Sequence, residues 1–120
     1  MQKAFINGGN LACELSGSGK ETVVFLNGIA MSIAHWKYYV QALSPEYRCL
    51  CHDFRGQIMS DMGGGPYSFA QHADDLAALM RSLGIEKAHL VGTSYGSEVA
   101  MVFALAHPGK TVFCLGSDGA

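Results

Sequence analysis

The chain has 120 residues, enough for one packed core and therefore for one domain or part of one. Hydrophobic residues make up 49% of it and charged residues 15%, which excludes a disordered chain and favours a buried α/β protein. The formal net charge of -2 provides no basic surface, so neither nucleic acid nor a membrane is expected as a partner.

The sequence begins with a predicted β-hairpin followed by a buried strand. Gln2–Ile6 and residues 11–15 are apolar-rich runs on either side of Asn7-Gly8-Gly9-Asn10, a pattern typical of a hairpin turn. Thr22–Leu26 is a continuous β-branched and aromatic run, which indicates a strand buried on both faces.

A helix and a further strand are expected next. Ser32 is a suitable N-cap, and apolar residues follow it at helical spacing until Ser44-Pro45. These apolar residues are Ile33, Trp36, Val40 and Leu43. Residues 47–51 then predict a strand that leads into His52 and Asp53.

In the second half, Ser68-Phe69-Ala70-Gln71 is a capping-box pattern that predicts the start of a helix, and Gly84 is expected to end it. The apolar face of this helix comprises Leu76, Leu79, Met80 and Leu83. Residues 88–91 predict a strand, 99–106 a helix buried on most sides, and 111–115 a last strand. Alternation of strands and helices predicts a mostly parallel sheet with right-handed crossovers.

The segment Gly92-Thr93-Ser94-Tyr95-Gly96 lies between an expected strand and an expected helix. Such a sharp turn strains the backbone of its central residue and lifts that side chain clear of the sheet. Gly92 and Gly96 are required because a Cβ there would collide with the neighbouring strand or helix. The amides and dipole of the following helix favour the negative charge that acyl transfer develops. This context predicts Ser94 as a nucleophile.

With these motifs in place, residues 3–120 resemble the α/β-hydrolase family, in particular its single-domain esterases, lactonases and C–C hydrolases. The resemblance rests on the Gly-x-Ser-x-Gly segment and on two others, Leu26-Asn27-Gly28-Ile29 and Asp53-Phe54-Arg55-Gly56-Gln57. It implies a three-layer α/β fold, with Ser94 as nucleophile and the backbone N–H groups of Ile29 and Tyr95 as the oxyanion hole. Asn27 and Gly28 would hold the oxyanion loop in place.

Three positions depart from the usual family pattern. Asn27 stands where His is common, and the Asn-Gly form also occurs in acyltransferase-like relatives. Gln57 is followed by Ile58 where a Gly is usual. Ser97 follows Gly96 where a second Gly often stands.

Complete members of this family are longer, and their acid and histidine come after the nucleophile, in the order Ser, Asp, His. Residues 1–120 are therefore interpreted as the amino-terminal part of one α/β-hydrolase domain, without its carboxyl-terminal strands. Asp118 is a candidate acid because it follows the sixth strand, although an Asp beside Gly is also typical of a turn.

None of the five histidines has the position that the family uses for its base. His72 is expected on a polar helix face, and His107 in the last turn of a helix, where positive charge suits the dipole. His35 can line the site. His52 and His89 are expected to be packed or hydrogen-bonded within strands.

Other candidates have structural interpretations. Asp53 and Arg55 are expected to brace the loop after the fourth strand. The candidates for lining an apolar acyl pocket are Met31, Trp36, Met59 and Met62. Core packing is the alternative role for each of them. No group of His, Cys, Asp and Glu has metal-ligand spacing, so no metal or other cofactor is expected.

The four cysteines do not form a disulfide pattern, since Cys49 and Cys51 lie two apart on one expected strand while Cys13 and Cys114 are far away in sequence. With no secretory signal in the sequence, reduced thiols and a cytoplasmic location are expected.

The sequence therefore predicts a serine hydrolase that acts on a small-molecule ester, lactone or related acyl compound through a Ser94 acyl-enzyme. Two alternatives stay open: an acyltransferase that uses the same nucleophile, and a non-catalytic binding or assembly protein on part of a hydrolase fold. The chain alone is expected to be nearly inactive, because it lacks the histidine and acid of a triad. Residues 111–115 would form an apolar sheet edge, so self-association through that edge is expected.

Overall fold

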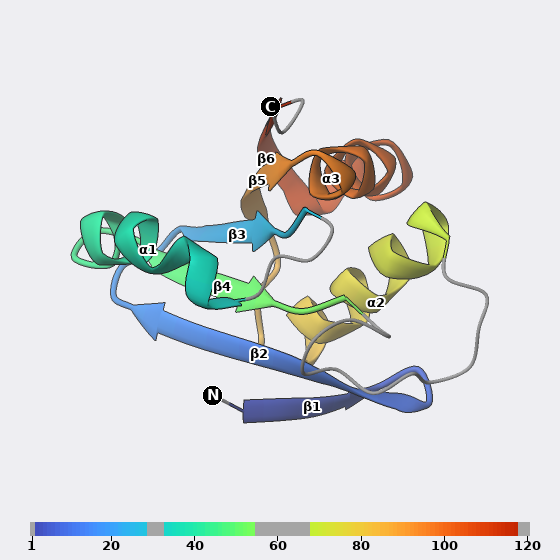
Figure 1. The fold of residues 1–120 in the computed structure, drawn as a ribbon, viewed down its shortest axis with the longest axis horizontal. Coiled ribbons are helices and arrows are strands. Elements are labelled where there is room, and N and C mark those ends of the chain that lie inside the picture. Colours follow the sequence, from blue (N-terminus) through green and yellow to red (C-terminus); the bar gives the residue numbers. More distant parts are fainter. Residues whose placement is uncertain (1, 29–32, 55–67, 118–120) are drawn as a thin grey trace.

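A single sheet organises the chain (Figure 1). The computed structural model describes residues 2–28, 33–54 and 68–117. Within these ranges the strands are β1 (Gln2–Ile6), β2 (Gly9–Gly17), β3 (Thr22–Leu26), β4 (Arg48–His52), β5 (Ala88–Thr93) and β6 (Thr111–Ser117). Their order in the sheet is β1-β2-β4-β3-β5-β6. The hairpin β1-β2 is antiparallel and joins β4 antiparallel, whereas β4, β3, β5 and β6 run parallel. The mostly parallel sheet with an amino-terminal hairpin is therefore confirmed.

Helices cover the two faces of the sheet. The helical elements are η1 (Ile33–Trp36), α1 (Lys37–Leu43), α2 (Phe69–Ser82), α3 (Tyr95–Ala106) and η2 (Pro108–Lys110). On one face, Ile33 and Trp36 pack in a buried cluster with Phe25 of β3. On the other face, α2 and α3 pack in a larger buried cluster with residues of the strands, and the helices contribute Leu76 and Phe103 among others. The two clusters give the three layers that the sequence predicts, and every residue of β3 between them is buried.

The turns and caps follow from the local sequence. Asn7 and Gly8 form the hairpin turn with φ values of 49° and 87°, the positive values that an Asn-Gly type I′ turn requires. At the start of α2, the Ser68 side chain accepts a hydrogen bond from the backbone N of Gln71 at 3.0 Å. The Gln71 side chain donates to Asp75 Oδ1 at 2.9 Å, so the predicted N-cap is confirmed but the reciprocal half of the capping box is not.

The helix after Ser94 differs from the prediction in two ways. It begins directly at Tyr95 instead of at residue 99, and it is not buried on most sides, because Met101 and Leu105 are exposed. Its buried positions follow one helical stripe and are Gly96, Val99, Ala100 and Phe103. Val99, Ala100 and Phe103 of this stripe pack into the core cluster, whereas Met101 and Leu105 are exposed on the outer face. In the described part of the chain, no helix has the length and hydropathy that crossing a membrane requires.

Candidate active site

Ser94 joins the end of β5 to the first residue of α3 and is exposed. Its backbone has φ 53° and ψ -118°, a conformation that costs a residue with a side chain about 1–3 kcal/mol. The first turn of α3 holds this conformation, because the Ser94 carbonyl oxygen accepts hydrogen bonds from Ser97 N at 2.9 Å and Ser97 Oγ at 2.7 Å. A strained serine is thus presented at the carboxyl edge of the sheet, at the position where the sequence predicts a nucleophile.

Gly92 and Gly96 allow β3, β5 and α3 to meet backbone to backbone at this turn. A Cβ on Gly92 would lie 2.6 Å from the carbonyl carbon of Gly96 and 2.8 Å from the backbone N of Ser97. A Cβ on Gly96 would lie 2.6 Å from the carbonyl oxygen of Asn27 and would also collide with the carbonyl of Leu26. Neither position has room for a side chain.

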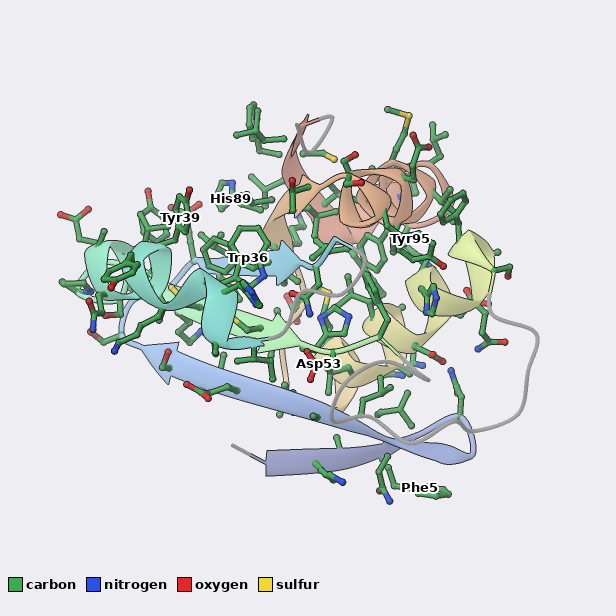
Figure 2. All side chains as sticks on the ribbon, viewed as in Figure 1. Phe5, Trp36, Tyr39, Asp53, His89 and Tyr95 are labelled. Atoms are coloured by element: carbon green, nitrogen blue, oxygen red, sulfur yellow. The ribbon has the colours of Figure 1, made fainter. Side chains whose placement is uncertain are left out.

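Tyr95 anchors the start of α3 through an aromatic cluster. Its ring lies 5.0 Å from that of Phe69, 5.5 Å from His72 and 5.7 Å from Phe54, measured between ring centroids. Figure 2 shows the side chain between α3 and α2, and its partial burial raises the pKa of the phenol. The N–H groups in the first turn of a helix have no acceptor within the helix, so the Tyr95 amide is available as an oxyanion donor.

Asn27 is the polar centre of the neighbouring loop and is fully buried at the end of β3. Its Nδ2 donates to the carbonyl oxygen of His52 at 3.1 Å and to Asp53 Oδ1 at 3.0 Å. Its Oδ1 accepts a hydrogen bond from Trp36 Nε1 at 2.6 Å. These bonds tie together the end of β3, the end of β4 and η1, beside the predicted oxyanion loop.

Sequence reasoning missed two parts of this network. Trp36 was expected in an acyl pocket or the core, and it also donates to Asn27. Asp53 was expected to act with Arg55, which lies outside the described residues, and the structure shows it accepting from Asn27. The available signal was Asn27 itself, since a polar residue directly after a fully buried strand needs buried partners.

The described histidines do not converge on Ser94, and no described histidine is hydrogen-bonded to the Ser94 hydroxyl. His35 is exposed and lines a cavity of about 420 Å³ together with Trp36, Gly92 and Thr93. This cavity lies beside the Ser94 turn on the α1 face of the sheet, and Ser94 is not part of its wall. His35 therefore lines a cavity beside the turn that does not include the serine.

The other histidines have structural surroundings. His52 is buried against the ring of Phe54, as expected for a packed histidine. His72 is buried as well, so its predicted place on a polar helix face is wrong: the ring fills the space between Phe54 and Tyr95. The remaining two lie away from the turn, with His89 Nε2 2.8 Å from Glu21 Oε1 and His107 Nε2 3.6 Å from Asp74 Oδ1.

Several residues for which the sequence predicts a role lie outside the described residues: Ile29, Met31, Ser32, Arg55, Gln57, Met59, Met62 and Asp118. No disulfide joins any of the four cysteines, all of which lie within the described ranges. No three His, Cys, Asp or Glu side chains in those ranges are grouped so that they could hold a metal ion.

Comparison with known proteins gives consistent matches. A family model described as alpha/beta hydrolase fold matches residues 21–117. A fluoroacetate dehalogenase from a Burkholderia species is 37% identical over 101 residues, covering 80% of this chain and 33% of the relative. A 2-hydroxy-6-oxononadienedioate/2-hydroxy-6-oxononatrienedioate hydrolase from Pseudomonas putida is 35% identical over 115 residues, covering 86% of this chain and 39% of the relative.

Among solved structures, the enol-lactonase from Burkholderia xenovorans LB400 superposes with a TM-score of 0.87 at 29% identity. The match covers 92% of this chain and 44% of the lactonase. The chain therefore spans less than half the length of the relatives that it matches.

Proposed function

Because this chain belongs to the alpha/beta hydrolase fold family, we propose that it carries the nucleophile of a serine hydrolase that acts on an ester, lactone or related acyl compound. The observation that supports the proposal most directly is the backbone of Ser94, held at φ 53° and exposed at the carboxyl edge of the sheet. A strained, exposed serine at the start of a helix is suited to attack on a carbonyl carbon.

In the proposed reaction, Ser94 Oγ bonds to the carbonyl carbon, and the C=O electron pair moves onto the oxygen. The amides of Tyr95 and Ile29 donate to this oxyanion, in a site where removal of one donor typically lowers kcat about 10²–10³-fold. The electron pair on the oxyanion then re-forms the C=O bond, and the bond to the leaving group breaks. An acyl-enzyme remains until water releases the acid. The proton of Ser94 passes to a base and then to the leaving group.

The base and its acid partner are proposed to come from a segment beyond the described residues. This chain covers 33–39% of the length of the two curated relatives described above, and in the family order both groups follow the nucleophile. Without a base, Ser94 keeps the weak nucleophilicity of an ordinary hydroxyl, so residues 1–120 alone are proposed to be nearly inactive. A small acyl compound is the proposed partner.

Labelling with a fluorophosphonate probe tests the proposal in the protein produced from the complete reading frame. The wild type should become labelled, and Ser94→Ala should abolish labelling. Ser82→Ala is the matched control: it removes an exposed serine hydroxyl that donates to the Leu79 carbonyl oxygen in α2 and takes no part in the Ser94 turn, and labelling should persist. Undiminished labelling of Ser94→Ala would exclude Ser94 as the nucleophile.

A further inference from the structure

A second cavity lies at the opposite end of the parallel strands from Ser94. It has a volume of about 360 Å³, and Thr22 and Arg48 line it at the starts of β3 and β4. The remaining lining residues are Lys20, Glu21, Gly84, Glu86, Lys87, His89 and Val112. Since Ser94 follows the far end of β5, the cavity is about one strand length away, roughly 15–20 Å. It is therefore separate from the proposed active site.

Two residues that line this cavity, Thr22 and Arg48, carry buried polar atoms without partners. Thr22 is 1% exposed, and neither its Oγ1 nor Arg48 Nε has a hydrogen-bond partner among the described residues. The two residues are paired in register on neighbouring parallel strands, so their side chains leave the same face of the sheet. An arginine N–H can only donate, and a threonine hydroxyl can donate as well. The group that would satisfy both is an acceptor.

The charges around the cavity favour an anion. Lys20, Arg48 and Lys87 provide three cations, against the carboxylates of Glu21 and Glu86. One of these carboxylates is already engaged, because Glu21 Oε1 lies 2.8 Å from Nε2 of His89. Positive charge therefore predominates among the residues that line the cavity.

We propose that this cavity binds a small oxyanion, the phosphate or carboxylate group of a small molecule, with Arg48 and Thr22 as its inner donors. The planar guanidinium of arginine suits the oxygens of both groups, and hydrogen bonds between ionised partners are the strong ones. Lys20 and Lys87 add charge at the rim. The site does not depend on the chemistry at Ser94.

The test follows the ¹⁵N–¹H resonance of Arg48 Nε by NMR while sodium phosphate or, separately, sodium acetate is added at constant ionic strength. A saturable shift is expected with at least one of them and not with chloride. For Arg48→Gln and Thr22→Val, binding is measured from the backbone resonances of the residues that line the cavity. Each substitution should weaken binding about tenfold or more, the usual effect of losing a hydrogen bond to a charged group. Arg81→Gln is the matched control, because Arg81 is exposed and does not line the cavity.

A surface variant keeps the test independent of folding. Glu86 is exposed at the rim, so Glu86→Gln should leave the fold intact and tighten the binding of either anion by removing a repelling charge. Thr22→Val should raise the melting temperature in the absence of anion, because it removes an unsatisfied hydroxyl. Equal responses to chloride and to both oxyanions, or unchanged affinity in both Arg48→Gln and Glu86→Gln, would overturn the proposal.

Discussion

The indole N–H of Trp36 donates a hydrogen bond of 2.6 Å to the side-chain oxygen of Asn27, and both side chains are buried. The same amide donates from its nitrogen to the carbonyl oxygen of His52 and to Asp53. Asn27 thus satisfies donor and acceptor atoms of three residues at once. Because buried polar atoms are costly when left unpaired, this network should fix the backbone that leads into the predicted oxyanion loop.

The first prediction removes one donor from this network. Trp36→Phe keeps an aromatic ring beside Phe25, whose centroid lies 4.9 Å from that of Trp36, but leaves Asn27 Oδ1 without its indole donor. We expect the free energy of unfolding, from urea titration followed by circular dichroism, to fall by about 1–3 kcal/mol. The control is Tyr38→Phe on exposed Tyr38, which should change little. Equal stability of the two variants would mean that the indole bond adds nothing to folding.

The second prediction concerns the close approach of backbones at the Ser94 turn. Gly96→Ala would press a methyl group against the carbonyls of Leu26 and Asn27, and should lower the free energy of unfolding by about 1–3 kcal/mol. Gly109→Ala is the control, because a Cβ at Gly109 meets no atom within 4 Å. Thermal denaturation of both variants measures the difference. A Gly96→Ala protein as stable as Gly109→Ala would contradict the packing described at this turn.

The elements could be predicted because they depend on local patterns, whereas their spatial neighbours could not. The all-apolar run of β3 identified a strand buried on both faces, and Asn-Gly identified the hairpin. Nothing in the local sequence places β3 between β4 and β5, since strand order depends on how crossovers fold in space. The burial of His72 was missed for the same reason: its cover comes from Phe54 and Tyr95, which are distant in sequence.

In the candidate site too, local patterns could be predicted from the sequence and spatial contacts could not. Gly92, Ser94 and Gly96 could be identified because the turn imposes its residue types locally. The partners of Asn27 could not be chosen from sequence, because they come from a loop after β4 and from η1. A pattern can show that a buried amide needs partners, but only the fold determines which atoms reach it.

The third prediction tests the strain at Ser94. At φ 53° and ψ -118°, glycine meets little steric resistance, whereas alanine keeps the Cβ that makes this conformation unfavourable. Ser94→Gly should therefore be more stable than Ser94→Ala by about 1 kcal/mol, even though glycine gains more entropy on unfolding. Comparison of the two urea midpoints measures this difference. If Ser94→Ala proved the more stable, the turn would store no strain of this kind.

The fourth prediction concerns stability at low pH. The pKa of His52 is lowered from 6.5 to about 4, mainly by burial and then by the nearby His72, while Asp75 opposes the change. The unfolded chain thus takes up a proton near pH 6.5, and the folded chain only near pH 4. Stability should be complete above about pH 6.5 and fall by up to about 3 kcal/mol as the pH drops to about 4.

His52→Leu tests the origin of this loss. Leucine cannot take a proton, so the variant should lose much less stability than the wild type over the same pH range. His35→Gln removes an exposed histidine and should keep the wild-type dependence. Urea titrations at several pH values between 4 and 7.5 give the comparison. An identical decline in wild type and His52→Leu would assign the effect to another group.

The last prediction concerns the two edges of the sheet, β1 and β6. The β1 strand carries Lys3, a charge of the kind that discourages pairing with another chain, whereas β6 contains neither charge nor proline. Its Phe113 and Leu115 are 58% and 55% exposed, and Leu115 also lines the apolar cavity beside Trp36. We therefore expect residues 1–120 alone to self-associate through β6, by strand pairing and burial of this apolar surface.

A pair of lysine substitutions separates the two edges. Phe113→Lys combined with Leu115→Lys places two like charges on the β6 edge, so pairing of two copies there would bring four cations together. Size-exclusion chromatography with light scattering should then shift from dimer or larger species toward monomer. Phe5→Lys on β1 is the matched control, since Phe5 is 73% exposed and points away from the body of the molecule (Figure 2). If the wild type were monomeric, or if Phe5→Lys dissociated it and the β6 double variant did not, β6 would not be the contact. Pairing through β1 is physically unfavourable, because a partner strand would have to lie beside the charge of Lys3. It would also leave the longer, uncharged β6 exposed to water.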